Sequence, residues 1–172
     1  MYKRGFKTRA EKTAVRMRKN LGRLPTDPLN MWKVAEKHGI PIWLPEDIPG
    51  LDKAARKILL EEDSSSWSAI TIRFDGKTVI VLNSSHTKAR QASNLAHEIS
   101  HLIIGHKGAQ TFMNTDAGLL LASYDKQEED EANWLAGCLL LPREACIYIK
   151  KQKLSDEQVR KKYGISQQML NY

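Results

Sequence analysis

The segment His97-Glu98-Ile99-Ser100-His101 carries two histidines four residues apart, with a glutamate directly after the first. On a helix, side chains at positions i and i+4 share a face, with Cβ atoms about 5–6 Å apart. Two imidazoles placed in this way can bind one tetrahedral zinc ion. Glu98 lies off the ligand axis and can hydrogen-bond the water that attacks a substrate. The spacing therefore predicts a zinc hydrolase in which His97 and His101 bind the metal and Glu98 is the general base.

The residues around this motif predict a helix that ends at Gly105, with Ser84 or Ser85 as the N-cap. Apolar residues recur along it at steps of three and four, which indicates a buried face. They are Ala92, Leu95, Ala96, Ile99, Leu102 and Ile103. Because His97 and His101 fall beside this stripe, we expect the site at the border between the core and a cleft.

A catalytic zinc site usually has a third protein ligand and leaves the fourth position to water. A second predicted helix, about residues 126–141, begins with the acids Glu128, Glu129, Asp130 and Glu131. Acids in a first turn can simply complement the helix dipole, which explains some of the four. The buried face of this helix is marked by Ala132, Leu135, Ala136 and Leu139. Glu129 continues that face, so we expect it to be the third ligand, with Glu131 and Glu128 as alternatives.

Three further residues near the motif have polar side chains that could support the site. Asn133, one turn after Glu129, could orient His97 or His101 through the free ring N–H. His106 follows His101 by only five residues, so we expect a structural or solvent-facing histidine rather than a ligand. Tyr124 and His106 are the candidates for stabilising an oxyanion.

The remaining elements predict an α+β fold that is mostly helical with a short antiparallel sheet. Alternating runs at 67–74 and 77–83 flank Asp75-Gly76, which indicates a two-residue β-hairpin. Residues 40–44 are a short strand, and Pro41 favours an edge position. Helices are expected at about 8–20, 28–38 with Asp27 as the cap, 143–152, and from 155 to Tyr163 with a Ser155–Gln158 capping box. The segment 107–123 is interpreted as a loop that flanks the cleft.

Length and composition favour one compact domain with appendages: 172 residues, of which 41% are hydrophobic. No apolar run is long enough to span a membrane, and no apolar segment follows the basic N-terminus as in a signal peptide. Cys138 and Cys146 do not resemble a disulfide framework or a paired-cysteine metal site. Two reduced thiols indicate the cytoplasm as the location.

The positive charge is concentrated at the N-terminus. The whole chain carries a formal net charge of +7, and residues 1–23 contain nine basic residues against the single acid Glu11. Such a segment can contact nucleic acid or an acidic partner surface, or it can be a solvated helix. Both interpretations stay open at this point.

Two runs resemble the ImmA/IrrE-type metallopeptidase family. The run Ala-Arg-Gln-Ala-Ser-Asn-Leu-Ala-His97-Glu98-Ile-Ser-His101-Leu-Ile-Ile-Gly-His is similar to the active helix of that family. The run Glu129-Asp-Glu-Ala-Asn133-Trp-Leu-Ala-Gly-Cys-Leu-Leu-Leu-Pro is similar to its second signature, Glu-x-x-Ala-Asn-x-Phe-Ala-x-x-Leu-Leu-x-Pro. The chain departs from the pattern at Leu135, where Phe is usual, and at Ser100, where Gly is frequent. Neither position touches the proposed chemistry, and the resemblance covers about residues 28–165.

The resemblance implies a small gluzincin-like peptidase domain in which His97, His101 and Glu129 bind zinc and Glu98 is the base. It also implies a protein substrate, commonly the helix-turn-helix repressor of a phage, mobile element or stress regulon. The expected organisation is a basic N-terminal helix or arm at 1–24, a metallopeptidase domain at 25–152, and a helical extension at 153–172 that ends abruptly, as in a shortened chain. The alternative function is a regulator that binds a repressor or DNA and uses zinc only structurally.

Overall fold

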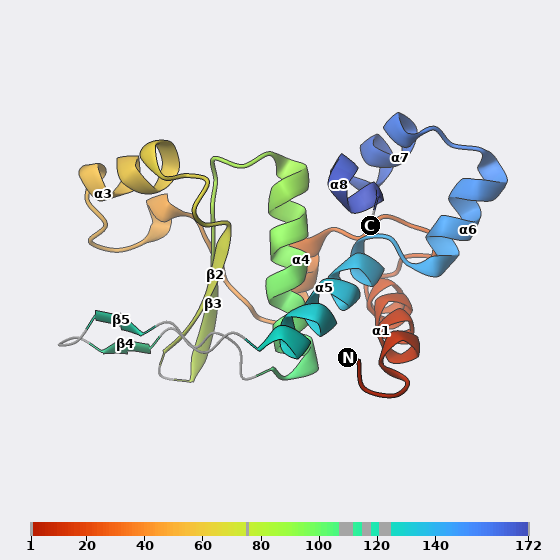
Figure 1. The fold of residues 1–172 in the computed structure, drawn as a ribbon, viewed down its shortest axis with the longest axis horizontal. Coiled ribbons are helices and arrows are strands. Elements are labelled where there is room, and N and C mark those ends of the chain that lie inside the picture. The colour runs from red at the N-terminus through yellow and green to blue at the C-terminus, as the bar shows by residue number, and fades with distance from the viewer. Residues whose placement is uncertain (1, 75, 107–111, 115–117, 121–124, 172) are drawn as a thin grey trace.

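Helix α4 (Lys88–Ile104) runs through the middle of the computed structural model, with a small sheet on one side and helix α5 (Lys126–Leu140) on the other (Figure 1). The structure describes residues 2–74, 76–106, 112–114, 118–120 and 125–171. The fold is α+β and mostly helical, as the sequence predicted. Within these residues, no helix is long and apolar enough to cross a membrane.

Shorter helices surround this centre. They are α1 (Phe6–Asn20), α2 (Met31–Lys37), α3 (Lys53–Lys57), α6 (Arg143–Gln152), α7 (Asp156–Tyr163) and α8 (Gln167–Leu170). A 3-10 turn, η1 (Pro45–Asp47), precedes α3, and a π-helical turn, η2 (Ile58–Glu62), follows it. Helices α6, α7 and α8 gather at the end of the molecule away from the sheet (Figure 1).

The sheet has the strand order β1-β3-β2. Strands β2 (Ala69–Phe74) and β3 (Lys77–Leu82) form the predicted hairpin, with Phe74 opposite Lys77. Gly76 has a φ of 70°, the left-handed conformation that such a tight turn requires. Strand β1 (Ile42–Trp43) pairs in parallel with β3 and is an edge strand, as Pro41 indicated. The sheet is therefore mixed rather than purely antiparallel.

The segment 107–123 is not loop throughout, which corrects the prediction. Strands β4 (Phe112–Asn114) and β5 (Gly118–Leu120) pair antiparallel, with Met113 opposite Leu119. Three residues per strand give too little alternation for a strand to be recognised in the sequence. The remaining residues of this segment lie outside those that the structure describes.

Two predicted N-caps are wrong by a few residues. Helix α4 is capped by Thr87, whose side chain accepts the N–H of Arg90, rather than by Ser84 or Ser85. Ser85 lies in the turn before the helix, where its N–H and its hydroxyl both donate to Oδ1 of Asn83. At the other end, Gly105 closes α4 with a φ of 80°, as predicted.

Helix α2 is capped by Asn30 and not by Asp27. The Asp27 carboxylate instead accepts the N–H of Leu24 in the preceding turn. The Ser155–Gln158 capping box at the start of α7 is present as predicted.

Helix α1 belongs to the same core as α4 and α5. Its buried Ala10, Ala14 and Met17 join one hydrophobic cluster with Leu95 of α4 and Leu139 of α5. Eight basic residues of the segment 1–23 remain exposed or line the surface, whereas the ninth, Arg18, is completely buried. The division of the chain into an arm, a peptidase domain and an extension stays a prediction. The thiols of Cys138 and Cys146 are free, the first buried and the second exposed.

Candidate metal centre

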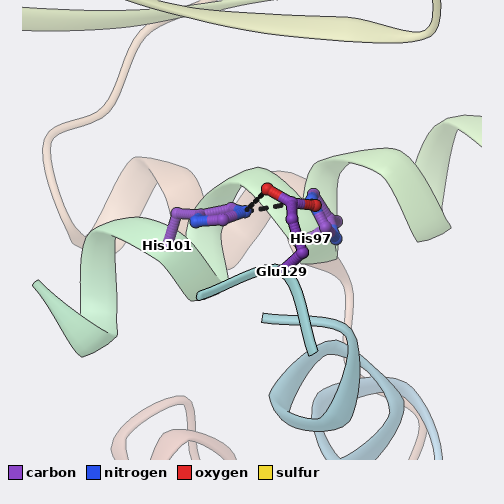
Figure 2. Close-up of side chains that lie close together, drawn as sticks. All are labelled: His97, His101 and Glu129. Atoms are coloured by element: carbon purple, nitrogen blue, oxygen red, sulfur yellow. Dashed lines mark hydrogen bonds and ion pairs between the residues drawn. The ribbon is translucent and has the colours of Figure 1, made fainter. Parts of the chain in front are cut away.

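Helices α4 and α5 bring His97, His101 and Glu129 together, with one ligand atom of each within 4.8 Å of the others. Figure 2 shows the two imidazoles rising from α4 toward the carboxylate of α5. The Nε2 atoms of His97 and His101 each lie 3.2 Å from a Glu129 carboxylate oxygen and 3.0 Å from one another. The two helices therefore place three potential metal ligands around one point.

The hydrogen bond of Asn133 fixes which nitrogen of His97 carries the proton. Nδ1 of His97 lies 3.0 Å from Oδ1 of Asn133, which can only accept. Nδ1 must therefore carry the hydrogen, and Nε2 keeps its lone pair. Of the two histidines predicted as partners of Asn133, the structure shows a contact with His97.

Burial keeps His101 neutral. Removal of this ring from water is the main cause that lowers the pKa of His101 to about 4, and its neighbours His97, His106 and Arg73 act in the same direction. A neutral imidazole is the form that binds a metal. The three facing side chains are thus one glutamate and two histidines, whose facing oxygen and nitrogen atoms can all bind a cation. Two imidazole nitrogens and one carboxylate oxygen match the His₂Glu set of catalytic zinc sites.

Glu98 lies on α4 beside the cluster but is not part of it. Its Oε2 accepts a hydrogen bond from the Thr71 hydroxyl of strand β2. Burial raises the pKa of Glu98 and so does the charge of Glu129, whereas the Thr71 hydrogen bond and His97 lower it, with a net upward shift. A carboxyl group whose pKa is raised toward neutrality suits a general base. Thr71 could not be predicted from the sequence, because its contact with Glu98 depends on how the sheet packs against α4.

The alternative ligands lie elsewhere. Glu131 is 2% exposed and contacts His106, so it faces away from the cluster. Glu128 does not belong to the group of three. His106 is buried, and both of its ring nitrogens have partners, which leaves neither for an oxyanion. Tyr124, the other oxyanion candidate, lies outside the described residues.

A pocket of about 390 Å³ adjoins the cluster at His97. Its walls come from α4, α5 and the C-terminal helix α8. The lining residues are Ser93, Asn94, His97, Asn133, Ala136, Ser166, Gln168 and Met169. This lining has no acidic or lysine side chain, so an uncharged polar or small apolar group fits best beside the candidate metal centre.

Comparison with known proteins gives one family match. Residues 55–172 match the model of a peptidase family described as the IrrE N-terminal-like domain. The matched region is more than half of the chain and contains His97, Glu98, His101 and Glu129. A search of curated proteins gives no significant match.

A solved structure with a similar fold is a Mycobacterium tuberculosis transcriptional regulator. The alignment has a TM-score of 0.53 at 13% sequence identity and covers 98% of this chain. The chain spans 46% of the length of that regulator, so the likeness concerns the fold of one part of it.

Proposed function

We propose that this protein, which belongs to the peptidase family of IrrE N-terminal-like domains, is a zinc-dependent endopeptidase. The observation that carries the proposal is the convergence of His97, His101 and Glu129, with the buried carboxyl of Glu98 beside them. These three side chains are the proposed zinc ligands, and Glu98 is the proposed general base.

Each residue then has a distinct task in peptide hydrolysis. A zinc ion in this site would lower the pKa of a bound water and polarise the scissile carbonyl. Glu98 takes a proton from the attacking water and passes it to the leaving amide nitrogen. Thr71 holds the carboxylate of Glu98 in place, and Asn133 holds the ring of His97.

The variant Glu98→Gln tests the chemistry. The amide cannot accept the proton of the water, so we expect cleavage to fall by at least about 10²-fold. Zinc content, measured by atomic absorption after dialysis, should stay near one ion per chain. Asp130→Asn on α5 is the matched control. Full cleavage by Glu98→Gln would contradict the role of Glu98, and the absence of zinc in the unaltered protein would contradict the metal.

We further propose that the substrate is a regulatory protein, in particular a helix-turn-helix repressor of a phage, mobile element or stress regulon. The support is the family resemblance together with a similar fold in a transcriptional regulator. The test incubates the protein with the repressor encoded beside its own gene, with and without a zinc chelator, and follows fragments by mass spectrometry. Fragments that form only without chelator support the proposal, and an intact repressor in both arms contradicts it.

The alternative function is a regulator that binds a repressor or DNA without proteolysis. The observation in its favour is a row of exposed cations on α1, formed by Arg9, Lys12, Arg16 and Lys19. Stable, salt-sensitive binding of the repressor or of DNA without any fragment would favour this alternative. The two functions are compatible, because none of these four cations belongs to the proposed ligand set or lines the pocket beside His97.

A further inference from the structure

Behind His101, on the side away from the metal centre, lies a buried histidine–glutamate pair that the proposed chemistry does not use. Nδ1 of His106 is 3.0 Å from Nδ1 of His101, and Nε2 of His106 is 3.3 Å from Oε2 of Glu131. The side chains of His106 and Glu131 are only 5% and 2% exposed. A glutamate is rarely buried to this extent unless it has a defined partner.

The directions of these hydrogen bonds follow from the chemistry of the two ends. An ionised carboxylate can only accept, so Nε2 of His106 must carry a hydrogen. In a neutral His106 ring, Nδ1 is then the acceptor, and it faces Nδ1 of His101. His101 must therefore donate from Nδ1, which leaves the lone pair of its Nε2 directed at Glu129.

The carboxylate of Glu131 is surrounded by hydrogen-bond donors. Burial alone would raise the pKa of Glu131, but hydrogen bonds from His106, Gln127 and the backbone of Lys3, with the Lys3 charge, bring it below the ordinary value. The Gln127 amide donates to the second oxygen, Oε1, at 3.2 Å. Both carboxylate oxygens are thus satisfied, and Oε2 remains directed at His106.

The backbone holds His106 in register with His101. Gly105 takes a left-handed conformation at the end of α4, and the N–H of His106 then donates to the carbonyl of His101 at 3.0 Å. Arg73 of strand β2 donates to the carbonyl of His106 at 3.4 Å. The turn that ends α4 therefore places the ring of His106 against the ring of His101.

We propose that Glu131 and His106 are positioning residues that fix the Nδ1–H tautomer of His101 and thereby present its Nε2 lone pair to the metal. The inference rests on the proposed function for its metal. The two histidines are then positioned separately. The amide of Asn133 positions His97, whereas His106 and Glu131 together position His101. Such outer contacts commonly contribute about 10–100-fold to metal affinity.

The variant Glu131→Gln tests this directly, because an amide can donate where the carboxylate could only accept. A donated amide N–H at Nε2 of His106 would move the hydrogen of that ring to Nδ1, and His101 would then carry its own hydrogen on Nε2. In ¹⁵N NMR of the metal-free variant, we expect the His101 ring to change from the Nδ1–H tautomer to the Nε2–H tautomer. We also expect zinc affinity, measured by chelator competition, to fall about 10–100-fold.

Asp130→Asn is the matched control, since it makes the same carboxylate-to-amide change one residue away and should alter neither measurement. A second pair of variants covers the case in which Glu131→Gln does not fold. His106→Asn keeps an acceptor near Nδ1 and should retain more zinc affinity than His106→Phe, which has none.

An unchanged His101 tautomer and unchanged zinc affinity in folded Glu131→Gln would overturn the inference, as would equal affinities of His106→Asn and His106→Phe. The tautomer is read in metal-free protein, so it separates this inference from the proposed function. If the unaltered protein binds no zinc but Glu131→Gln still exchanges the His101 tautomer, the positioning role stands and the proposed function fails.

Discussion

Glu98 receives its position from a residue on another element, the Thr71 hydroxyl of strand β2. Thr71→Val removes this hydroxyl with little change in shape and leaves one carboxylate oxygen without its donor. A hydrogen bond to a charged group contributes about 1.5–3 kcal/mol, so we expect kcat to fall roughly 10–100-fold. Zinc content and KM should be nearly unchanged, because Thr71 contacts neither the three proposed ligands nor the pocket beside His97. Steady-state kinetics with the proposed repressor substrate would measure both constants.

The control for this prediction is Thr71→Ser, which keeps the hydroxyl and should retain most of the activity. A Thr71→Val enzyme with unaltered kcat would show that Glu98 needs no support from the sheet. Loss of zinc from Thr71→Val would show instead that the contact stabilises the metal centre as a whole.

Individual site residues differ in how far the sequence could predict them. His97, Glu98 and His101 depend only on helical spacing, which is a local property. Glu129 follows from its place on the buried face of α5, since Ala132 and Leu135 are indeed buried. Thr71 and the pair His106–Glu131 could not be predicted, because their contacts join separate elements through tertiary packing. The sequence makes Glu131 an alternative metal ligand, whereas in the structure this side chain contacts His106.

Among the elements, α1 is tied to α5 by one buried arginine. Arg18 is 0% exposed and donates to the carbonyls of Asp27 and Leu139, both at 2.8 Å. Burial lowers the pKa of Arg18 to about 10, although nearby Tyr163 and acids raise it, so the group is charged at neutral pH. The carbonyl of Leu139 belongs to the last turn of α5, where no intrahelical donor is available. Arg18 thus satisfies a helix end from a neighbouring helix.

Arg18→Met should lower the free energy of unfolding by about 2–4 kcal/mol, because it leaves buried carbonyls without donors. Equilibrium urea unfolding followed by circular dichroism would measure the change. Arg16→Met, two residues earlier and exposed, should stay within about 0.5 kcal/mol of the unaltered protein. Equal stability of the two variants would mean that Arg18 is not needed to join the helices.

The sequence predicts the long periodic helices and strands, but not the residues at which the helices begin. The hairpin and the helices around residues 88–104 and 126–140 follow from alternation and from three- and four-residue spacing. The observed N-caps of α2 and α4 differ from the predicted ones by a few residues, because several nearby Ser, Thr, Asn and Asp residues can each act as a cap. The burial of Arg18 was also missed, since a sequence shows its charge and not the carbonyls that it meets.

For the whole molecule, the uneven charge makes one face of α1 strongly basic. Arg9, Lys12, Arg16 and Lys19 are spaced by three or four residues and are exposed, so they form one ridge opposite the buried side of the helix. Such a ridge attracts polyanions through phosphate contacts and counterion release. We therefore expect weak binding of nucleic acid without preference for sequence.

The triple variant Lys12→Gln/Arg16→Gln/Lys19→Gln should weaken binding of a short DNA duplex at low salt. In the unaltered protein, the logarithm of the binding constant should fall linearly with the logarithm of the salt concentration. Each phosphate contact contributes about 0.9 to that slope, so the variant should reduce it by about 3. Fluorescence anisotropy over a salt series would measure both effects.

A second triple variant separates the ridge from net charge, because Lys150→Gln/Lys151→Gln/Lys161→Gln removes three exposed cations from α6 and α7. If only the ridge binds DNA, this control should keep nearly the full slope, and both triple variants should cleave substrate normally. Equal losses in the two variants would assign the binding to overall charge. No binding by the unaltered protein at low salt would leave α1 as a solvated helix whose function is to bury Ala14 and Arg18 against α5.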